Sequence, residues 1–555
     1  MLASSLRRSA HPLSLVLLAM LVVACPKTET ATSGSAAPPE KGVVIERAGD
    51  ATKVTIDGGF VYSVPDDLDT PLPWDDEVAT GTLDNGMRWY VEKNVVPKDR
   101  VELWLAVRVG SVQEDDDQQG LAHLLEHMAF NGTTNFPGNS LITYLESVGT
   151  RFGAHLNAHT SFEETIYKLQ VPTDDEELLG KGFTVLSDWA GGMLLNDEDI
   201  EGERGVVLEE WRRSRGAMGR TWDVTLPLRY FGAPHANRRP IGTEDSLKSF
   251  TPDAVRRFYA DWYRPDLMAV VVVGDIEPAD AERRIQEAFG GLAAPAEPRQ
   301  RDKVTIPTHE DTLVGIVADP EQRFSSVGLV HKMAGEEVMS HQAYRDGIVT
   351  RLYTRVMRER LAEIVRNPES PLQRGFVSHR RMTPTTESQS VGGSAQGGKE
   401  REALEVLMLE VERARRFGVL ESELERAKAG MLDSYRGSWV DRENQESRRV
   451  LGELIRNFTN GENVPGIGYE YAAASAWLPG ITKAEVDAVA KAFLPEGSRV
   501  ATVIRPGGEL PALTEEDVLS TVAGVATADL EAPVDVVVPE ALVANPPEPG
   551  TVVST

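Results

Sequence analysis

The sequence predicts a mixed α/β fold arranged as two similar domains. Its 555 residues are more than one hydrophobic core usually organises, which indicates at least two domains. From about residue 73 onward, β-like segments alternate with amphipathic, helix-like segments. Two parts of the chain also end alike, with a threonine that can cap a helix, the helix itself, and then an apolar strand. The capping threonines, Thr251 and Thr482, lie 231 residues apart.

The elements of the first domain follow from local patterns. The expected strands alternate apolar residues and contain many β-branched or aromatic ones. Two of the expected helices have acidic first turns, Ser140 can cap another, and Pro252 suits the first position of the helix that Thr251 opens. We expect strands over 87–91, 101–109, 165–171 and 268–273, and helices over 119–130, 141–148, 174–195 and 197–213.

The second domain is largely helical in composition. Helix-forming residues dominate 340–365 and 399–456, and the helix that begins after Thr482 leads to a strand over 500–504. A linker with two prolines covers 293–303. We therefore place the first domain at 73–295, the second at 305–508, and a proline-rich, hinge-like tail at 509–555 that contains a short helix near 514–522.

The N-terminus has the pattern of an export signal. Residues 1–24 combine a basic start with a short apolar run, which is too short to span a bilayer comfortably. The run ends at Cys25 in a sequence that resembles a bacterial lipobox, which implies cleavage before Cys25 and its lipidation. The alternative is an ordinary signal peptide with an incidental cysteine. We expect residues 25–72 to be the lipidated cysteine and a flexible tether, on a protein anchored in a bacterial cell envelope, facing the periplasm or in the outer membrane.

The composition excludes several other classes of protein. Apolar residues make up 41% and charged residues 26% of the chain, as in ordinary globular proteins. The formal net charge of −28 argues against nucleic-acid binding through broad neutralisation of phosphates. A single cysteine excludes a disulfide framework within the chain and a cysteine-rich zinc module.

The chemistry concentrates in one short segment of the first domain. His123 and His127 are four residues apart, so on a helix both imidazoles lie on one face and can reach one metal ion. Glu126 precedes the second histidine and lies beside that ion without being forced to bind it. This is the inverted HxxEH arrangement, in which the glutamate serves as general base. The alternative is a helix with two surface histidines, but burying them among leucines without partners is costly.

Five motifs in order resemble the pitrilysin/insulinase family of zinc metallopeptidases. The segment 120–133, which includes HxxEH, is similar to the family's active-site helix. The other matches are Asn-Ala-His-Thr-Ser within 157–167, Glu-Arg-Gly-Val-Val-Leu-Glu-Glu at 203–210, Pro-Ile-Gly-Thr at 240–243, and 262–275. The resemblance covers about 73–290 closely and 305–508 more loosely. It implies an α+β fold of two homologous α/β sandwich-type domains, each a mixed antiparallel sheet packed with helices.

The resemblance implies a role for each residue of the motifs. His123, His127 and Glu203 are expected to bind one Zn²⁺ per chain, and Glu126 to activate a zinc-bound water for hydrolysis of peptide bonds. Glu203 lies 76 residues after His127, a separation that the family uses. The expected substrate-binding residues are Asn157, Ala158, His159 and Thr160, on a strand to which an extended peptide or unfolded polypeptide would add.

Some features depart from the family. Members often have an acidic residue seven positions before the third ligand, and relative to Glu203 that position is Asn196. The second domain has no HxxEH, and the chain has the length of the metal-bearing half of the long members. We expect that a partner chain or a second copy supplies the opposing half, or that this chain is a shortened form with weaker activity.

The alternatives to a zinc endopeptidase are a non-catalytic core or binding subunit of the same fold in a hetero-oligomer, and a metal-binding lipoprotein without hydrolysis.

Overall fold

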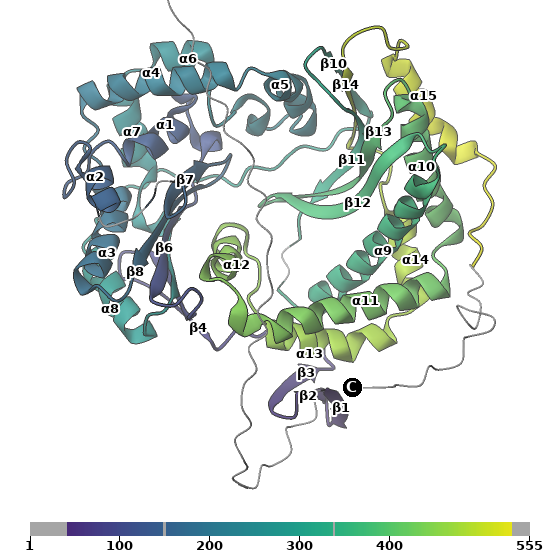
Figure 1. The fold of residues 1–555 in the computed structure, drawn as a ribbon, viewed down its shortest axis with the longest axis horizontal. Helices are drawn as coiled ribbons and strands as arrows, with labels where there is room; N and C mark the ends of the chain where they lie inside the picture. Colours follow the sequence, from purple (N-terminus) through teal and green to yellow (C-terminus); the bar gives the residue numbers. More distant parts are fainter. Residues whose placement is uncertain (1–41, 148–150, 152, 337–338, 536–555) are drawn as a thin grey trace, which may run out of the picture.

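Two sheets that share the order of five strands form the framework of the protein (Figure 1). The computed structural model describes residues 42–147, 151, 153–336 and 339–535. The first sheet has the order β4-β5-β9-β6-β8-β7, and β5 and β9 are its one parallel pair among these residues. Its strands are β4 (Val78–Thr82), β5 (Arg88–Lys93), β6 (Arg100–Val107), β7 (Leu156–Thr160), β8 (Thr165–Pro172) and β9 (Met268–Gly274).

The second sheet repeats this arrangement without a counterpart of β4. Its order is β10-β14-β11-β13-β12, and again the strand that ends the domain, β14, pairs in parallel with one neighbour and antiparallel with the other. Its strands are β10 (Leu313–Asp319), β11 (Ser325–Ala334), β12 (Leu372–Thr383), β13 (Thr386–Ala395) and β14 (Arg499–Pro506). The shared topology confirms the predicted fold class of two similar domains with mixed, mainly antiparallel sheets.

Helices cover one face of each sheet and form the main cores. In the first domain they enclose a large apolar cluster with β5, β6 and β9. These helices are α1 (Leu121–Met128), α2 (Ser140–Ser147), α3 (Glu176–Gly191), α4 (Asp197–Arg213), α6 (Glu244–Ser249), α7 (Pro252–Trp262) and α8 (Pro278–Phe289). In the second domain they are α9 (His341–Arg366), α10 (Glu400–Phe417), α11 (Glu421–Val440), α14 (Lys483–Ala492) and α15 (Glu515–Gly524). Among the described residues, no helix is long and apolar enough to cross a membrane.

The two domains exchange helices. The segment 399–456, expected to be mostly helical, is interrupted by Gly418 at φ +74° and by 441–446, and continues as α12 (Ser447–Asn460). Although α12 comes from the second half of the chain, it lies on the open face of the first sheet (Figure 1). There Leu451, Leu454 and Phe458 bury apolar side chains of β5, β6 and β9. In return, α5 (Ala217–Arg229) of the first half contacts β10 and β14 of the second sheet.

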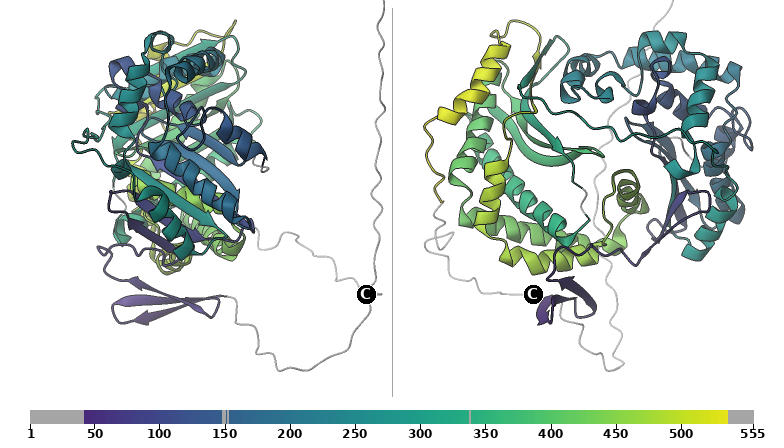
Figure 2. Two further views of the ribbon diagram at one scale, coloured as in Figure 1. Left: turned by 90° about the vertical axis from the view of Figure 1, so that its left-hand side faces the viewer. Right: turned by 180° about the vertical axis from the view of Figure 1, so that it is seen from behind.

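A third sheet corrects the expected tether over 25–72. Strands β1 (Val43–Ala48), β2 (Ala51–Ile56) and β3 (Phe60–Pro65) form an antiparallel meander. Alternate side chains, Val54, Ile56 and Val64, are buried against aromatic residues of α13 (Ile467–Trp477), because period-two alternation gives this segment one apolar face. The purple strands of this small sheet lie below the two domains (Figure 2).

The expected hinge-like tail over 509–555 is also ordered in its described part, because α15 packs against α10 and β10 of the second domain. Residues 1–24, Cys25 and the end of the tail after 535 lie outside the described residues.

We predict that the α12 contact holds the two domains together. Leu454→Ala removes a fully buried side chain at this contact, and we expect the free energy of unfolding to fall by about 2–5 kcal/mol. Chemical denaturation and limited proteolysis between the domains measure the effect. Val440→Ala, at an exposed position on α11, is the control and should change stability by less than about 0.5 kcal/mol. Equal stability of the two variants would contradict this role for α12.

Candidate metal centre

The HxxEH helix, α1, is fixed at its start by a carboxylate from outside the helix. Gly120 precedes α1 at φ +94° and has no side chain to cap it. The buried carboxylate of Glu114 instead accepts hydrogen bonds from the backbone N–H groups of Gly120 (3.0 Å) and Ala122 (2.9 Å). A side chain at residue 120 would lie 3.1 Å from Gly242, within the Pro-Ile-Gly-Thr motif. Two of the sequence motifs are therefore in contact, and both position α1.

Two helices bring three potential metal ligands together. The imidazole rings of His123 and His127 on α1 lie 4.7 Å apart. The Oε2 atom of Glu210 on α4 lies 3.5 Å from Nε2 of His127 and 3.8 Å from Nε2 of His123. These separations are too long for direct hydrogen bonds. They are close to the roughly 3.3 Å between ligands that bind one zinc ion tetrahedrally at about 2.0–2.1 Å.

The residues present fit a zinc ion. Two imidazoles and one carboxylate form a donor set that zinc enzymes use, with a fourth position left open. Within the part of the chain that the structure describes, this is the one group of His, Cys, Asp and Glu side chains placed to share an ion. The buried Nδ1 atom of His123 has no protein hydrogen-bond partner among the described residues, so of the two histidines on α1 only His127 is oriented by a carboxylate.

The third potential ligand that the structure brings to the two histidines is Glu210, whereas the sequence predicted Glu203. Glu203 does not face the shared space between the histidines. Its Oε1 atom accepts a hydrogen bond from Nδ1 of His127 (2.7 Å), and its Oε2 atom accepts one from Asn131 (2.6 Å). A carboxylate on Nδ1 keeps the proton there and leaves Nε2 to bind a metal. Glu210 thus takes the position assigned to Glu203, and Glu203 orients a ligand.

With Glu210 as the third potential ligand, Asn196 is no longer a departure from the family pattern. Seven residues are close to two helical turns, so Glu203 and Glu210 lie on one side of α4. The acidic residue that the family often places seven positions before the third ligand is therefore Glu203. Asn196 precedes α4, and its side-chain amide donates a hydrogen bond to the nearby Asp199 (3.0 Å). The motif at 203–210 ends in the adjacent glutamates Glu209 and Glu210. Only the one on the side of α4 that faces α1 can approach the two histidines, and that residue is Glu210.

Burial and neighbouring charges shift the pKa values of the site. Burial, with the nearby His127, lowers the pKa of His123 to about 4, so this imidazole is neutral at pH 7. Burial also disfavours charge on His127, but its hydrogen bond to Glu203 and the surrounding carboxylates outweigh this and raise its pKa. Burial raises the pKa of Glu126, partly offset by a hydrogen bond from Thr160. These values describe the site without metal.

The expected substrate strand runs beside this centre. Asn157, Ala158, His159 and Thr160 all lie on β7, which is the edge strand next to β8. Thr160 donates a hydrogen bond from Oγ1 to Oε2 of Glu126 (2.6 Å), which joins the strand to the HxxEH helix. Ala158 lies against the first core, on the same side of the strand as Thr160, whereas Asn157 and His159 alternate to the other side. Their use in substrate binding stays a prediction.

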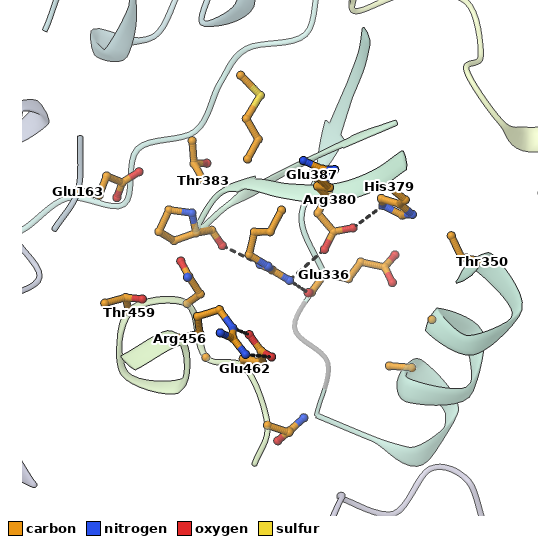
Figure 3. Close-up of a pocket in the computed structure, with 18 of the residues that line it drawn as sticks. Glu163, Glu336, Thr350, His379, Arg380, Thr383, Glu387, Arg456, Thr459 and Glu462 are labelled. Atoms are coloured by element: carbon orange, nitrogen blue, oxygen red, sulfur yellow. Dashed lines mark hydrogen bonds and ion pairs between the residues drawn. The ribbon is translucent and has the colours of Figure 1, made fainter. Parts of the chain in front are cut away.

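A cavity of about 830 Å³ opens where the turn after β7 meets the second domain (Figure 3). Its wall combines residues 161–164 with side chains of α9, the β12–β13 hairpin and the end of α12. Polar and ionisable side chains dominate the view, among them the paired His379 and Glu387 and the paired Arg456 and Glu462. Glu163 also lines the cavity and is paired with His235 and Arg301, so it is not a free surface charge. Sequence reasoning did not identify this wall, because its parts are far apart in the chain.

Comparison with known proteins agrees with this architecture. Residues 90–218 match the model of the insulinase family, peptidase family M16, and residues 249–431 match the model of the peptidase M16 inactive domain. A zinc protease PQQL-like protein of Arabidopsis thaliana is 32% identical over 474 residues, covering 85% of this chain and 47% of the relative. The probable zinc protease PqqL of Escherichia coli K12 is 32% identical over 382 residues, covering 68% and 41%.

A solved structure has the same fold. The first half of the periplasmic protease PqqL from Escherichia coli superimposes with a TM-score of 0.78 at 27% identity. The match covers 84% of this chain and all of that one. The chain spans about half the length of the curated relatives that it matches.

We predict that Glu210 and Glu203 contribute differently to zinc binding. Glu210→Gln removes a ligand and should abolish stoichiometric zinc, whereas Glu203→Gln only loosens His127 and should weaken affinity by about 10- to 100-fold. Chelator competition measures both. Glu209→Gln is the matched control, because Glu209 is exposed and paired with Arg212. Stoichiometric zinc in Glu210→Gln together with none in Glu203→Gln would restore the assignment made from the sequence.

Proposed function

This chain belongs to the insulinase family, peptidase family M16, and on that basis we propose that it is a zinc-dependent endopeptidase acting on peptides or unfolded polypeptides. The observation that carries the proposal is the convergence of His123, His127 and Glu210 beside Glu126 and the edge strand β7. A zinc ion held there supplies a Lewis acid that activates water and polarises a carbonyl group. We propose one such ion per chain.

Glu126 is placed to move the proton in this reaction. Thr160 occupies its Oε2 atom, which leaves Oε1 available to accept a proton from the attacking water. The same carboxyl group can then return the proton to the departing amine. Burial raises its pKa, which brings a carboxyl closer to the range where both transfers are efficient. The hydrogen bond from Thr160 fixes the orientation of the group throughout.

The edge strand β7 supplies the means of holding substrate. Its outer edge has no partner strand among the described residues, so an extended peptide can add to it through backbone hydrogen bonds. Asn157, Ala158, His159 and Thr160 would then run alongside the peptide, with Thr160 nearest the general base. Binding through the backbone favours unfolded segments over folded proteins, because only these expose a free strand.

We also propose that an opposing half faces this site, contributed by a second copy or by a homologous partner chain. The support is that a solved chain matched over its full length, and over 84% of this chain, is the first half of its protein. The competing proposal is that this chain is a non-catalytic core subunit. Its support is a curated relative, cytochrome b-c1 complex subunit 1 of Rattus norvegicus, which is 29% identical over 218 residues. The presence of Glu126 together with all three metal ligands favours the enzyme.

We propose export and lipid anchoring at Cys25, in the bacterial cell envelope. The support is the signal-like sequence before Cys25 and the similarity to a protease described as periplasmic. The acidic chain gains little attraction from an anionic membrane surface, so the lipid would provide the attachment.

We predict that Glu126→Gln separates catalysis from metal binding. The amide cannot take a proton from water, so cleavage of an unfolded polypeptide should fall by about 10²- to 10⁴-fold while zinc content stays stoichiometric. Assays contain the chain alone and mixed with a homologous chain, with chelator-treated protein as the blank. Zinc binding without cleavage in every mixture would favour the core-subunit alternative, and absence of zinc would refute the enzyme.

We predict that lipid attachment depends on the thiol of Cys25. Cells producing the protein should incorporate labelled palmitate into it and retain it in membranes, and Cys25→Ala should lose both properties. The variant should still be exported, because the apolar run before residue 25 is unchanged. An unlabelled wild-type protein would instead indicate an ordinary signal peptide.

A further inference from the structure

The edge strand β7 is held at both ends by arginines that lie outside the first sheet and its helices. β7 has five residues and one neighbouring strand, so its own hydrogen bonds give it little rigidity. Additional contacts fix the chain two residues before β7 and three residues after it. They come from Arg448 on α12 and from Arg301 in the linker between the domains.

Arg448 holds the start of the strand with two separate nitrogen atoms. Its Nη2 atom donates to the carbonyl oxygen of Ala154 (2.8 Å), two residues before β7. Its Nε donates to Oε1 of Glu102 on β6 (3.3 Å). Glu102 is only 2% exposed, and it also accepts hydrogen bonds from Trp104 (2.9 Å) and Gln170 (2.7 Å). Arg448 is therefore anchored to a rigid, buried carboxylate while it holds the backbone that leads into β7.

Arg301 holds the other end of the strand through Glu163. Its Nη2 atom donates to Oε2 of Glu163 (3.1 Å), and its Nε donates to the carbonyl oxygen of Arg108 (2.6 Å). Oε1 of Glu163 pairs with the fully buried His235 (3.1 Å), which stacks on Tyr230 at 5.0 Å. Glu163 lies three residues after β7, so this network fixes the turn that follows Thr160.

The contacts at the two ends of β7 are important because Thr160, on this strand, also contacts the proposed general base Glu126. Thr160 must stay at 2.6 Å from Glu126 while the free edge of the strand accepts a peptide. A slip of one residue would turn Thr160 away from Glu126 and reverse the sides of Asn157 and His159. Contacts at 154 and 163 oppose such a slip without occupying the free edge.

We infer that Arg448 and Arg301 are positioning residues that keep β7 in the register needed to bind an extended peptide beside Glu126. The domain without the metal site thereby contributes to substrate binding through α12, at a distance from the metal ligands. The part of this inference that concerns substrate rests on the proposed function. The part that concerns the strand is independent of it.

Hydrogen exchange and kinetics of the full chain test the inference together. In Arg448→Ala, amides of residues 154–160 should exchange about tenfold faster, because local opening of β7 becomes easier, while amides of β6 and β9 stay unchanged. Arg449→Ala is the matched control, since Arg449 is the exposed neighbouring arginine on α12. Arg448→Lys should behave like Arg448→Ala, because one ammonium group cannot reproduce two contacts from a planar guanidinium.

For cleavage of a quenched-fluorescent peptide, Arg448→Ala and Arg301→Ala should raise KM about fivefold or more with kcat nearly unchanged and zinc content equal to wild type. Unchanged exchange in β7, or a fall in kcat at constant KM, would overturn the inference. If wild type cleaves no peptide, either alone or mixed with a homologous chain, the proposed function fails and the substrate part of the inference fails with it. The exchange experiment still decides whether the arginines hold the strand.

Discussion

Burial of the open face of the first sheet by α12 is the contact on which the rest of the structure depends. A sheet with one face covered by helices leaves its other apolar face to be covered. In this protein the cover comes from the other half of the chain, and α5 is given to the second sheet in return. Neither domain completes its core alone. The exchange also places α12 beside β7 and brings the two domains together around the charged cavity.

The metal centre shows how burial and hydrogen bonding divide similar side chains into different roles. His123 and His127 are one helical turn apart, yet one is kept neutral by burial and the other is oriented by Glu203. Glu203 and Glu210 lie on one side of α4, yet only Glu210 faces the shared space between the imidazoles. Roles within one motif are thus set by the depth and direction of each side chain, which local sequence does not specify.

The sequence was sufficient where the information is local or periodic. The shared face of His123 and His127 follows from helical spacing, and the repeated domain ending correctly identified β9 and β14 as equivalent strands. It was insufficient where the answer depends on packing between distant segments. The choice of Glu210 over Glu203 requires the orientation of α4 against α1. The position of α12 requires the whole fold, and the sheet of β1 to β3 packs on an apolar surface that α13 and Trp439 of α11 provide.

The shortness of β7 has a consequence for solubility. An unpaired strand edge is a template on which other chains can add in the manner of amyloid, and long, flat, apolar edges are the most hazardous. This edge offers only five residues, about 17 Å of backbone, and Asn157 and His159 give it polar side chains. It can therefore remain open to solvent without promoting fibrous aggregation of the protein itself.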